Sequence, residues 1–355
     1  MTRFLITAAT CLSALALLPA SSSGHSDGRN GRIAWSRLNA DFSQAQIVTA
    51  NPDGSHLRVL TQPPEGASDL DPKWSPDGTR ILFARESGDH VEIVVMNADG
   101  RSQHVVSFGC TDPCVSDQAP TWAPDGHHIA FTRRVGPIVN GGARSLALWI
   151  GRDDGTHVRR LSPLDIDPIY EDAGANWSRD RSYIQFLRLR ADPLDDTHVQ
   201  AAVFRMRPDG TGDRQLTPWE INADVTDLSQ AAWGPTKDLV VFETNSHEPK
   251  AQNIATVPAT CSTLATCTRQ IRYLTTNPSD GATTSFNPAW APDGSRIAFA
   301  EAPSQPPGDT STDGYADIYT IDPDGRDRRL VSPGAEWNFR PDWGVRPRAW
   351  PFDKP

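Results

Sequence analysis

The chain has 355 residues, a formal net charge of −10 and an acidic pI of about 5.3. So acidic a chain, without a stripe of basic residues, argues against nucleic acid as a partner. The chain is long enough to bury an ample core as one domain.

The first residues have the pattern of a secretory signal peptide. Met1-Thr2-Arg3 is followed by an apolar run from Phe4 to Leu18 and by small residues up to Ser23. A charged start, a short apolar middle and a small-residue exit are typical of a cleaved leader. We therefore expect residues 1–23 to be a signal peptide and the mature protein to be secreted, periplasmic or in the cell envelope. No later stretch is apolar enough to be a transmembrane segment.

A five-residue motif, Trp-Ser-Pro-Asp-Gly at residues 74–78, recurs along the chain in intact and degraded copies. Its proline pre-sets φ, its aspartate bonds its own backbone and its glycine supplies a left-handed residue, so each copy predicts a tight reversal after a short strand. The spacing of 48 to 57 residues is slightly above the ~40–50 residues of short propeller repeats. Six tryptophans mark the copies: Trp74, Trp122, Trp177, Trp233, Trp290 and Trp343.

The same frame surrounds each copy. A β-rich run follows the turn, a variable loop comes next, and a third run such as Ile93 to Met96 ends in a second glycine turn at Asn97-Ala98-Asp99-Gly100. A fourth run such as Arg58-Val59-Leu60-Thr61 completes the unit, and four antiparallel strands make one propeller blade. The second-strand runs are Ile81 to Ala84, Ile129 to Thr132, Ile184 to Leu187, Leu239 to Phe242 and Ile297 to Ala300.

The two ends of the repeat array are complementary. The pattern begins in mid-blade, because Arg32-Ile33-Ala34-Trp35 matches a second strand, and it ends with Arg340 to Trp343, which matches a first strand with nothing after it. The ends should therefore share one blade, which closes the ring and removes its open edges. Counting second strands predicts an all-β, six-bladed β-propeller over residues 31–345, followed by a tail at 346–355.

Four cysteines of the expected mature chain lie in two close pairs, Cys110 with Cys114 and Cys261 with Cys267. In an oxidising compartment these spacings predict two local disulfides. A metal site is the alternative, but the spacings differ from those of a CxxC zinc ribbon.

With the repeats laid out, the chain resembles the TolB-like (WD40-like repeat) β-propeller family, whose repeat reads PxWSPDG, IAF, a loop, IY and DG. Pro72 to Phe83, Pro120 to Phe131 and Pro288 to Phe299 match it closely, whereas Ala175 and Ala231 replace the proline in two blades. TolB itself carries an additional N-terminal α/β domain. The resemblance therefore implies a stand-alone exported propeller whose function depends on its loops.

In such a propeller the glycine turns lie on one face, and the long loops between strands two and three and between blades lie on the other. The long-loop face and the channel mouth are the expected ligand-binding surface. Aspartates five residues before the tryptophan could bind a cation, a basic peptide or a glycan, although each could instead cap its own loop. The expected ligand-binding residues are Asp69, Asp71, Asp117, Asp172, Gln230, Asn287, Asn338 and Arg340.

A possible Ca²⁺ loop lies between Asp309 and Asp317. Asp309, Ser311, Asp313 and Asp317 resemble the oxygen ligands of a DxDxDGxxD loop, but a serine replaces one carboxylate. Three loop histidines, His90, His198 and His247, could alternatively meet over the channel as metal ligands. Trp219 and Trp337 could stack on a ligand or anchor the loops that carry them.

These features favour an exported, monomeric, non-catalytic module that binds a protein, peptide or glycan at the long-loop face and channel mouth. The sequence establishes no cofactor and suggests Ca²⁺ as a possible one. The alternative is a channel-based lyase, isomerase or hydrolase that uses the carboxylates Asp69, Asp117 and Asp172 or the loop histidines.

Overall fold

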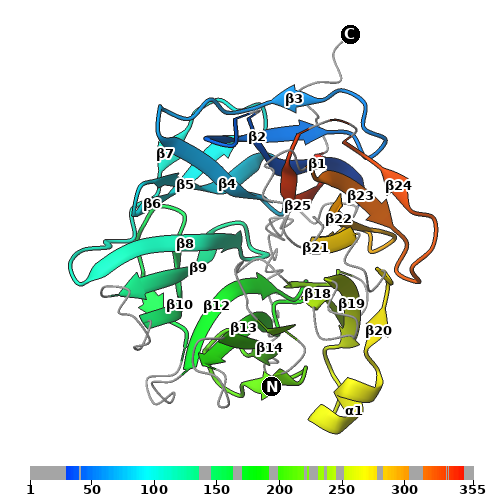
Figure 1. The fold of residues 1–355 in the computed structure, drawn as a ribbon. Helices are drawn as coiled ribbons and strands as arrows, with labels where there is room; N and C mark the ends of the chain where they lie inside the picture. The colour runs from blue at the N-terminus through cyan, green and yellow to red at the C-terminus, as the bar shows by residue number, and fades with distance from the viewer. Residues whose placement is uncertain are drawn as a thin grey trace, which may run out of the picture.

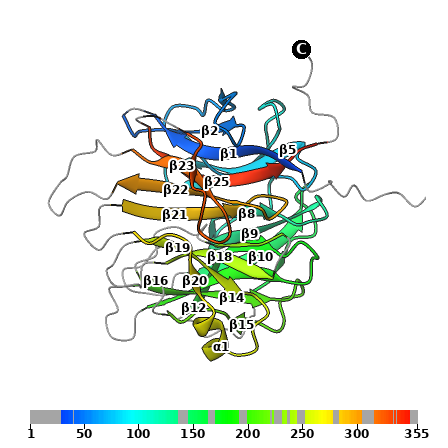
Figure 2. The same ribbon diagram turned by 90° about the vertical axis from the view of Figure 1, so that its right-hand side faces the viewer.

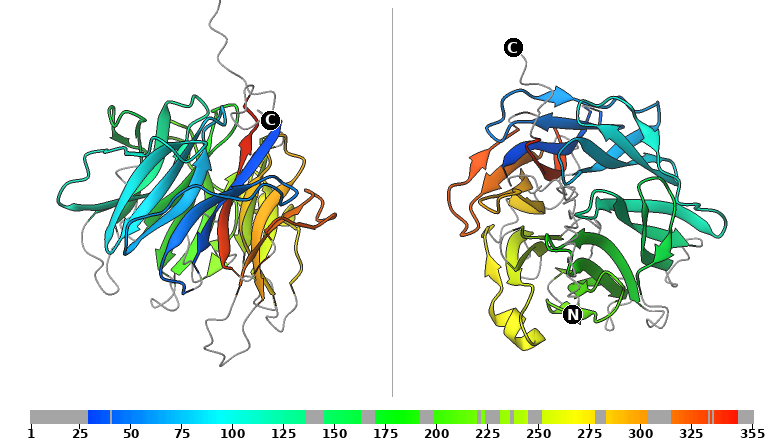
Figure 3. Two further views of the ribbon diagram at one scale, coloured as in Figure 1. Left: turned by 90° about the horizontal axis from the view of Figure 1, so that it is seen from above. Right: turned by 180° about the vertical axis from the view of Figure 1, so that it is seen from behind.

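The computed structural model describes residues 29–39, 41–135, 145–162, 170–191, 199–219, 222–223, 231–235, 238–244, 252–277, 283–303, 315–332, 334 and 336–347. Six antiparallel sheets surround a central channel, so the predicted six-bladed β-propeller is confirmed (Figure 1). Figure 3 shows the same ring from above and from behind. Within the described ranges, no helix is long and apolar enough to cross a membrane.

The blades are numbered here in chain order, and their strands run outward from the channel. In blades 1 to 3 they are β25 (Asn338–Val345), β1 (Asn30–Leu38), β2 (Ala45–Ala50) and β3 (Arg58–Val59); β4 (Ala67–Trp74), β5 (Arg80–Ser87), β6 (His90–Asn97) and β7 (His104–Val105); β8 (Cys114–Trp122), β9 (His128–Val135), β10 (Ser145–Arg152) and β11 (Arg159–Arg160). In blades 4 to 6 they are β12 (Tyr170–Trp177), β13 (Ile184–Ala191), β14 (Val199–Met206) and β15 (Arg214–Gln215); β17 (Ala231–Trp233), β18 (Leu239–Thr244), β19 (Asn253–Pro258) and β20 (Arg272–Tyr273); β21 (Thr283–Trp290), β22 (Ile297–Pro303), β23 (Asp317–Ile321) and β24 (Arg329–Leu330). In addition, β16 (Asn222–Ala223) pairs with β14.

Both faces of each blade are buried, which explains the continuous apolar runs of the second strands. Ile81 and Phe83 pack toward blade 1, whereas Leu82, which points to the opposite face, packs toward blade 3. Each repeat tryptophan joins such an interblade cluster; Trp74, for example, packs with Ala34 and Ile47 of blade 1. The core is therefore a ring of interblade clusters rather than one central cluster.

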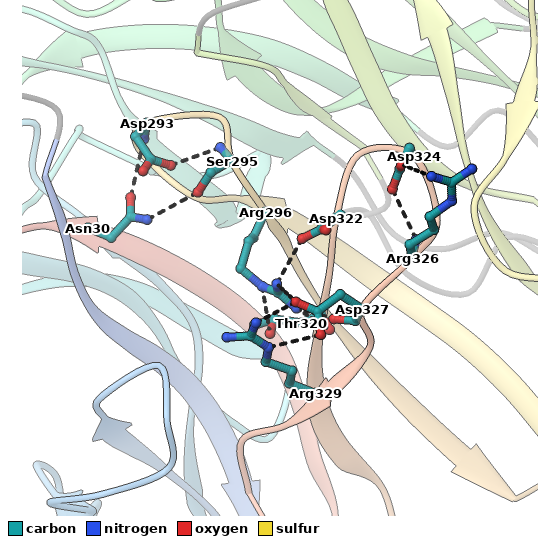
Figure 4. Close-up of polar contacts among 10 residues, drawn as sticks. All are labelled: Asn30, Asp293, Ser295, Arg296, Thr320, Asp322, Asp324, Arg326, Asp327 and Arg329. Atoms are coloured by element: carbon teal, nitrogen blue, oxygen red, sulfur yellow. Dashed lines mark hydrogen bonds and ion pairs between the residues drawn. The ribbon is translucent and has the colours of Figure 1, made fainter.

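The ring closes in blade 1, as predicted, because the C-terminal strand β25 pairs antiparallel with the N-terminal strand β1. Figure 2 shows these two strands side by side. The Trp35 indole N–H donates to Asn338 Oδ1 at 2.7 Å, and the Trp343 indole N–H donates to the Gly31 carbonyl at 3.3 Å. On the turn face, Asn30 Oδ1 also accepts the Asp293 N–H of blade 6 at 3.2 Å (Figure 4).

The second-strand alignment of blade 5 needed a correction of one residue. The apolar run begins at Leu239, but Val240 pairs with Trp233, just as Ile81 pairs with Trp74 in blade 2. The degraded turn after Trp233 has no aspartate-glycine pair to mark where the strand begins, so the extra apolar residue shifted the alignment.

Both predicted disulfides are present. Cys110 is bonded to Cys114 and Cys261 to Cys267, with Cα separations of 5.2 and 5.4 Å. The second bond ties down α1 (Leu264–Arg269), whose N-cap Thr263 accepts the Thr266 N–H through its hydroxyl. This short helix lies at the outer edge of blade 5 (Figure 1).

Candidate functional site

The channel contains a cavity of about 130 Å³. It is formed by the innermost strands, from three residues before each repeat tryptophan to two residues after it. Most of its wall consists of alanine, glycine, proline and tryptophan, whereas Asp71, Lys73 and Asp342 are charged. Because Pro235 and Pro292 of the first turns also line it, the cavity extends to the turn face. The sequence had indicated the opposite end of the channel.

A bulge in the innermost strand shapes the cavity. The residue three positions before the tryptophan has a left-handed backbone in blades 1, 2, 3, 4 and 6, and the strand register shifts there. Its N–H is directed at the preceding blade: the Gly174 N–H donates to Thr132 Oγ1 at 3.1 Å, and the Asp71 N–H donates to Ser36 Oγ at 3.2 Å. A bulge re-aims a side chain locally. The bulge residues are Arg340, Asp71, Ala119, Gly174 and Asn287, and of these Asp71, Ala119 and Gly174 line the cavity.

Three of the predicted ligand-binding residues are brought together by these bulges. Arg340 Nη1 lies 3.5 Å from Asp71 Oδ2, and the Arg340 N–H donates to Asn287 Oδ1 at 3.2 Å. The Asn287 N–H in turn donates to Glu243 Oε2 at 3.2 Å. A chain of polar contacts therefore runs from blade 5 to blade 2 along one side of the channel, opposite Ala119 and Gly174. Gln230, at the same repeat position, lies outside the described residues.

Asp342 and Lys73 form a second polar group, on the cavity wall. Asp342 Oδ2 accepts the Trp74 N–H at 2.8 Å. Burial raises the pKa of the Asp342 carboxyl, while the nearby Lys73 charge and the Trp74 N–H oppose that shift. No ion pair within 4.0 Å joins these two groups to each other in the described part of the chain.

The three predicted mouth carboxylates are each bound by an arginine of their own blade. Asp117 is 5% exposed and binds Arg133 through two hydrogen bonds of 2.7 and 2.8 Å. Asp69 with Arg85 and Asp172 with Arg188 repeat this bidentate pair at 2.7 to 3.1 Å. Each carboxylate lies in its own hairpin and does not meet the other two at a common point. This geometry favours a structural role, and their assignment to ligand binding stays a prediction.

The arginines of these pairs were missed by the sequence reasoning, although a signal was present. Each follows its aspartate by sixteen residues in three consecutive blades and stands two residues after the phenylalanine of the second strand. Each also lies over that phenylalanine; Arg133, for example, is 5.4 Å from Phe131 and 4.7 Å from the Trp149 ring. Asn338, in the position of blade 1 that is equivalent to these aspartates, is 2% exposed and accepts the Trp35 indole N–H rather than binding an arginine.

Of the predicted calcium ligands, only Asp317 falls within the described residues; Asp309, Ser311 and Asp313 lie outside them. Asp317 is 7% exposed, and its Oδ1 has no hydrogen-bond partner among the described residues. Burial, with a smaller contribution from the Glu301 charge, raises the pKa of the Asp317 carboxyl to about 6. Glu301 pairs with Arg328 and accepts the Ser285 hydroxyl at 3.2 Å.

The remaining loop candidates are only partly described. His90 is exposed and lies 3.4 Å from Glu92, while His198 and His247 lie outside the described residues. Trp219 stacks on Tyr170 with 5.6 Å between ring centroids, and Arg190 lies 4.3 Å from its ring. Trp337 stacks on Phe286 at 6.3 Å. Both tryptophans therefore have aromatic neighbours within the protein, as loop anchors should.

On the turn face, arginines connect neighbouring strands and turns. In blade 6, Arg296 donates to Thr320 Oγ1 at 3.1 Å and contacts Asp322 and Asp327 at 2.8 and 3.0 Å (Figure 4). Arg329 holds the same Asp327, and these arginine contacts lower the pKa of the Asp327 carboxyl. Arg32 makes the matching contacts to Thr49 in blade 1. These arginines therefore connect the start of the second strand with the third strand of the same blade.

Comparisons with known proteins bear on the fold. No protein-family model and no curated protein matches the sequence. TolB from Acinetobacter baumannii is similar in structure, with a TM-score of 0.60 and 16% identity over 88% of this chain and 66% of that one. Hydrazine synthase from Kuenenia stuttgartiensis gives a TM-score of 0.63 and 14% identity over 92% of this chain and 49% of that one.

A chain from a nidogen/laminin complex gives a TM-score of 0.59 and 10% identity over 89% of this chain and 99% of that one. This chain thus spans less than two thirds of the TolB chain and about half of the hydrazine synthase chain. At such identities the comparisons concern the fold and not the activity. The structure and its neighbours together show that the protein has the fold of a TolB-like six-bladed β-propeller.

Proposed function

We propose that this protein is an exported, non-catalytic binding module that holds a protein or peptide partner on its long-loop face. The proposal rests mainly on the ion pairs of Asp69, Asp117 and Asp172. Each is neutralised by a bidentate arginine, whereas a channel enzyme would need carboxylates that are free to exchange protons or hold a metal.

The size of the cavity supports the same proposal. Ligand sites for larger molecules usually have volumes of about 300–1,000 Å³, whereas this cavity has about 130 Å³. A protein, peptide or glycan of any length must therefore be held outside the cavity. The rigid ring would serve as a platform for loops, which is how propellers commonly present binding surfaces.

Two further observations support export and protein binding. Disulfides such as Cys110–Cys114 and Cys261–Cys267 form and persist in oxidising compartments, in agreement with the expected signal peptide. In addition, one neighbour in structure comes from a complex of two proteins, nidogen and laminin. That likeness supports the proposal by analogy only.

Site-specific photocrosslinking tests which face binds. A photoreactive phenylalanine is placed at His90, in the β5–β6 hairpin of the long-loop face, and in a matched variant at Arg101, in a glycine turn of the opposite face. Both sites are exposed, with side-chain exposures of 66% and 85%. We expect partner adducts from the His90 position and none from Arg101. Equal labelling from both faces, or adducts from Arg101 alone, would contradict the proposal.

A further inference from the structure

The cavity has two chemically different walls. Lys73 and Asp342, from blades 2 and 1, are charged. Trp233 and Trp290, from blades 5 and 6, form an apolar surface together with Ala231, Ala232 and Ala289. A channel cavity that held only water would not require an apolar surface in addition to the charged groups.

Lys73 and Asp342 both line the cavity and are close enough for the Lys73 charge to lower the pKa of the Asp342 carboxyl, but they make no direct ion pair. Asp342 uses Oδ2 to accept the Trp74 N–H, and no ion pair within 4.0 Å connects Asp342 with Lys73 among the described residues. Asp71, the third charge, already has Arg340 at 3.5 Å. A half-buried ammonium and a carboxylate are costly without partners, so a ligand that contacts both would be favoured. Lys73 is also the only lysine in the described part of the chain.

The volume limits the size of that ligand. An engineered cavity of about 150 Å³ accepts benzene, which has six non-hydrogen atoms. A cavity of about 130 Å³ thus has room for a molecule of about that size. The ligand must carry one anionic and one cationic group and a small apolar part.

We propose that the channel cavity binds a small α-amino acid as a zwitterion, with glycine, alanine and serine as the class that fits. The carboxylate binds the Lys73 ammonium, the α-ammonium binds the Asp342 carboxylate, and the short side chain faces Trp233 and Trp290. A molecule with a single charge leaves one wall group without a partner. Entry is from the turn face, past Pro235 and Pro292, so a partner on the long-loop face does not block it.

Calorimetry and thermal melts of the mature protein, after exhaustive dialysis, test the proposal with matched ligands. L-alanine is compared with propionate and ethylamine, which each keep one of its charges, and with L-tryptophan, which is too large. We expect saturable binding of L-alanine with a Kd of about 1 mM or lower, and affinities at least about tenfold weaker for both single-charge analogues. No binding of glycine, alanine or serine at about 10 mM, or equal binding of propionate or ethylamine, would overturn it.

Two variants locate the site. Lys73→Met removes the ammonium, and Asp342→Asn removes the charge while keeping an oxygen that can accept the Trp74 N–H. Each should weaken alanine binding by about tenfold or more, whereas Arg101→Gln on the exposed turn face should leave it unchanged. Alanine binding that survives in both cavity variants refutes the assignment. If neither variant folds, the wild-type ligand series still decides, with fluorotryptophan spectra reporting whether Trp233 and Trp290 sense the ligand.

Discussion

Asp117 with Arg133 and Asp172 with Arg188 are the more enclosed of the three aspartate–arginine pairs, because all four side chains are at most 8% exposed. Asp69 is equally buried, but its partner Arg85 is 20% exposed and is therefore better solvated. A buried pair need not stabilise the fold relative to apolar residues, but the loss of one partner leaves the other charge buried and unpaired. The cost of removing an aspartate should therefore follow the burial of its arginine.

We predict that Asp117→Asn lowers the free energy of unfolding by about 3–5 kcal/mol, because Arg133 would be left charged and buried. Asp69→Asn should cost clearly less. The double variant Asp117→Leu with Arg133→Met should recover part of the loss, since it removes both charges. Denaturant unfolding of the wild-type protein and the three variants measures these differences in the free energy of unfolding. A double variant less stable than Asp117→Asn would refute the explanation.

Asp317 gives a pH-dependent prediction of opposite sign to that of an ordinary ion-paired carboxylate. Its folded pKa of about 6 lies above the ordinary aspartate value of 3.8, so between these two pH values the folded state holds a proton that the unfolded state has released. Its contribution therefore destabilises the fold as pH rises from about 4 to about 6, and the penalty persists above that range. The effect is largest at neutral and alkaline pH.

Asp317→Asn should accordingly stabilise the protein by about 1–2 kcal/mol at pH 8, less than the full shift implies because of solvent screening. The gain should shrink toward pH 4. Melting temperatures across this range measure it. Asp41→Asn is the control, because a Ser43 hydrogen bond lowers the pKa of Asp41 and no gain is expected. A gain that is independent of pH would argue against the titration of Asp317.

At the scale of elements, the second glycine turn of a blade has two constraints. Gly155 has a φ of +81°, and a Cβ there would lie 2.4 Å from the Ser107 carbonyl oxygen of the preceding blade. Gly54, Gly100 and Gly210 make the same close approach to the neighbouring blade. The glycine of the aspartate-glycine repeat thus permits both the turn and the interblade contact.

Gly155→Ala should cost about 3 kcal/mol, since it combines left-handed strain with a backbone clash. Gly66→Ala is the matched control: its φ is +76°, but no described residue has an atom within 4 Å of the added Cβ. The control should lose only about 1 kcal/mol from strain. Thermal and denaturant unfolding compare the two, and equal losses would show that the interblade approach is unimportant.

The local signals of the sequence predicted the blades well, whereas the site required knowledge of register. The turn at Trp74 to Gly78 and the apolar run at Ile81 are determined by neighbouring residues, so the hairpin could be predicted. The pairing of Asp69 with Arg85 depends on a bulge that shifts the register between Leu70 and Lys73. The spacing from the tryptophan therefore predicted that the aspartates lie at the channel mouth, but it did not predict the arginines that bind them. The Lys73 and Asp342 pair joins two blades from opposite ends of the sequence, and no local pattern predicts it.

At the scale of the molecule, the closing strand β25 completes both the ring and the cavity. It supplies Asp342 to the cavity wall and Asn338 to the Trp35 indole N–H, and Trp74 packs closely against Gly344. Without β25, the strand β1 would become an unpaired edge and the interblade cluster around Ile33 would be exposed.

A chain that ends at Trp337 should therefore lose cooperative unfolding and bind a dye that reports exposed apolar surface. A synthetic peptide of residues 336–347, added in excess, should restore the near-UV signal of the tryptophans by completing blade 1. A peptide of the same composition in scrambled order is the control. Cooperative unfolding of the shortened chain without the peptide would contradict this view of closure.

At the left-handed bulge the backbone conformation is the same from blade to blade, whereas the side chain differs. Five blades have a described residue in that conformation, which costs about 1–2 kcal/mol for a residue other than glycine, and these residues are as different as Asp71, Ala119, Gly174, Asn287 and Arg340. The bulge position of the innermost strands therefore accepts different side chains without a change in the backbone. Evolution, or a designer, could exchange the chemistry of the pore one blade at a time, with no rearrangement of the strands that hold it.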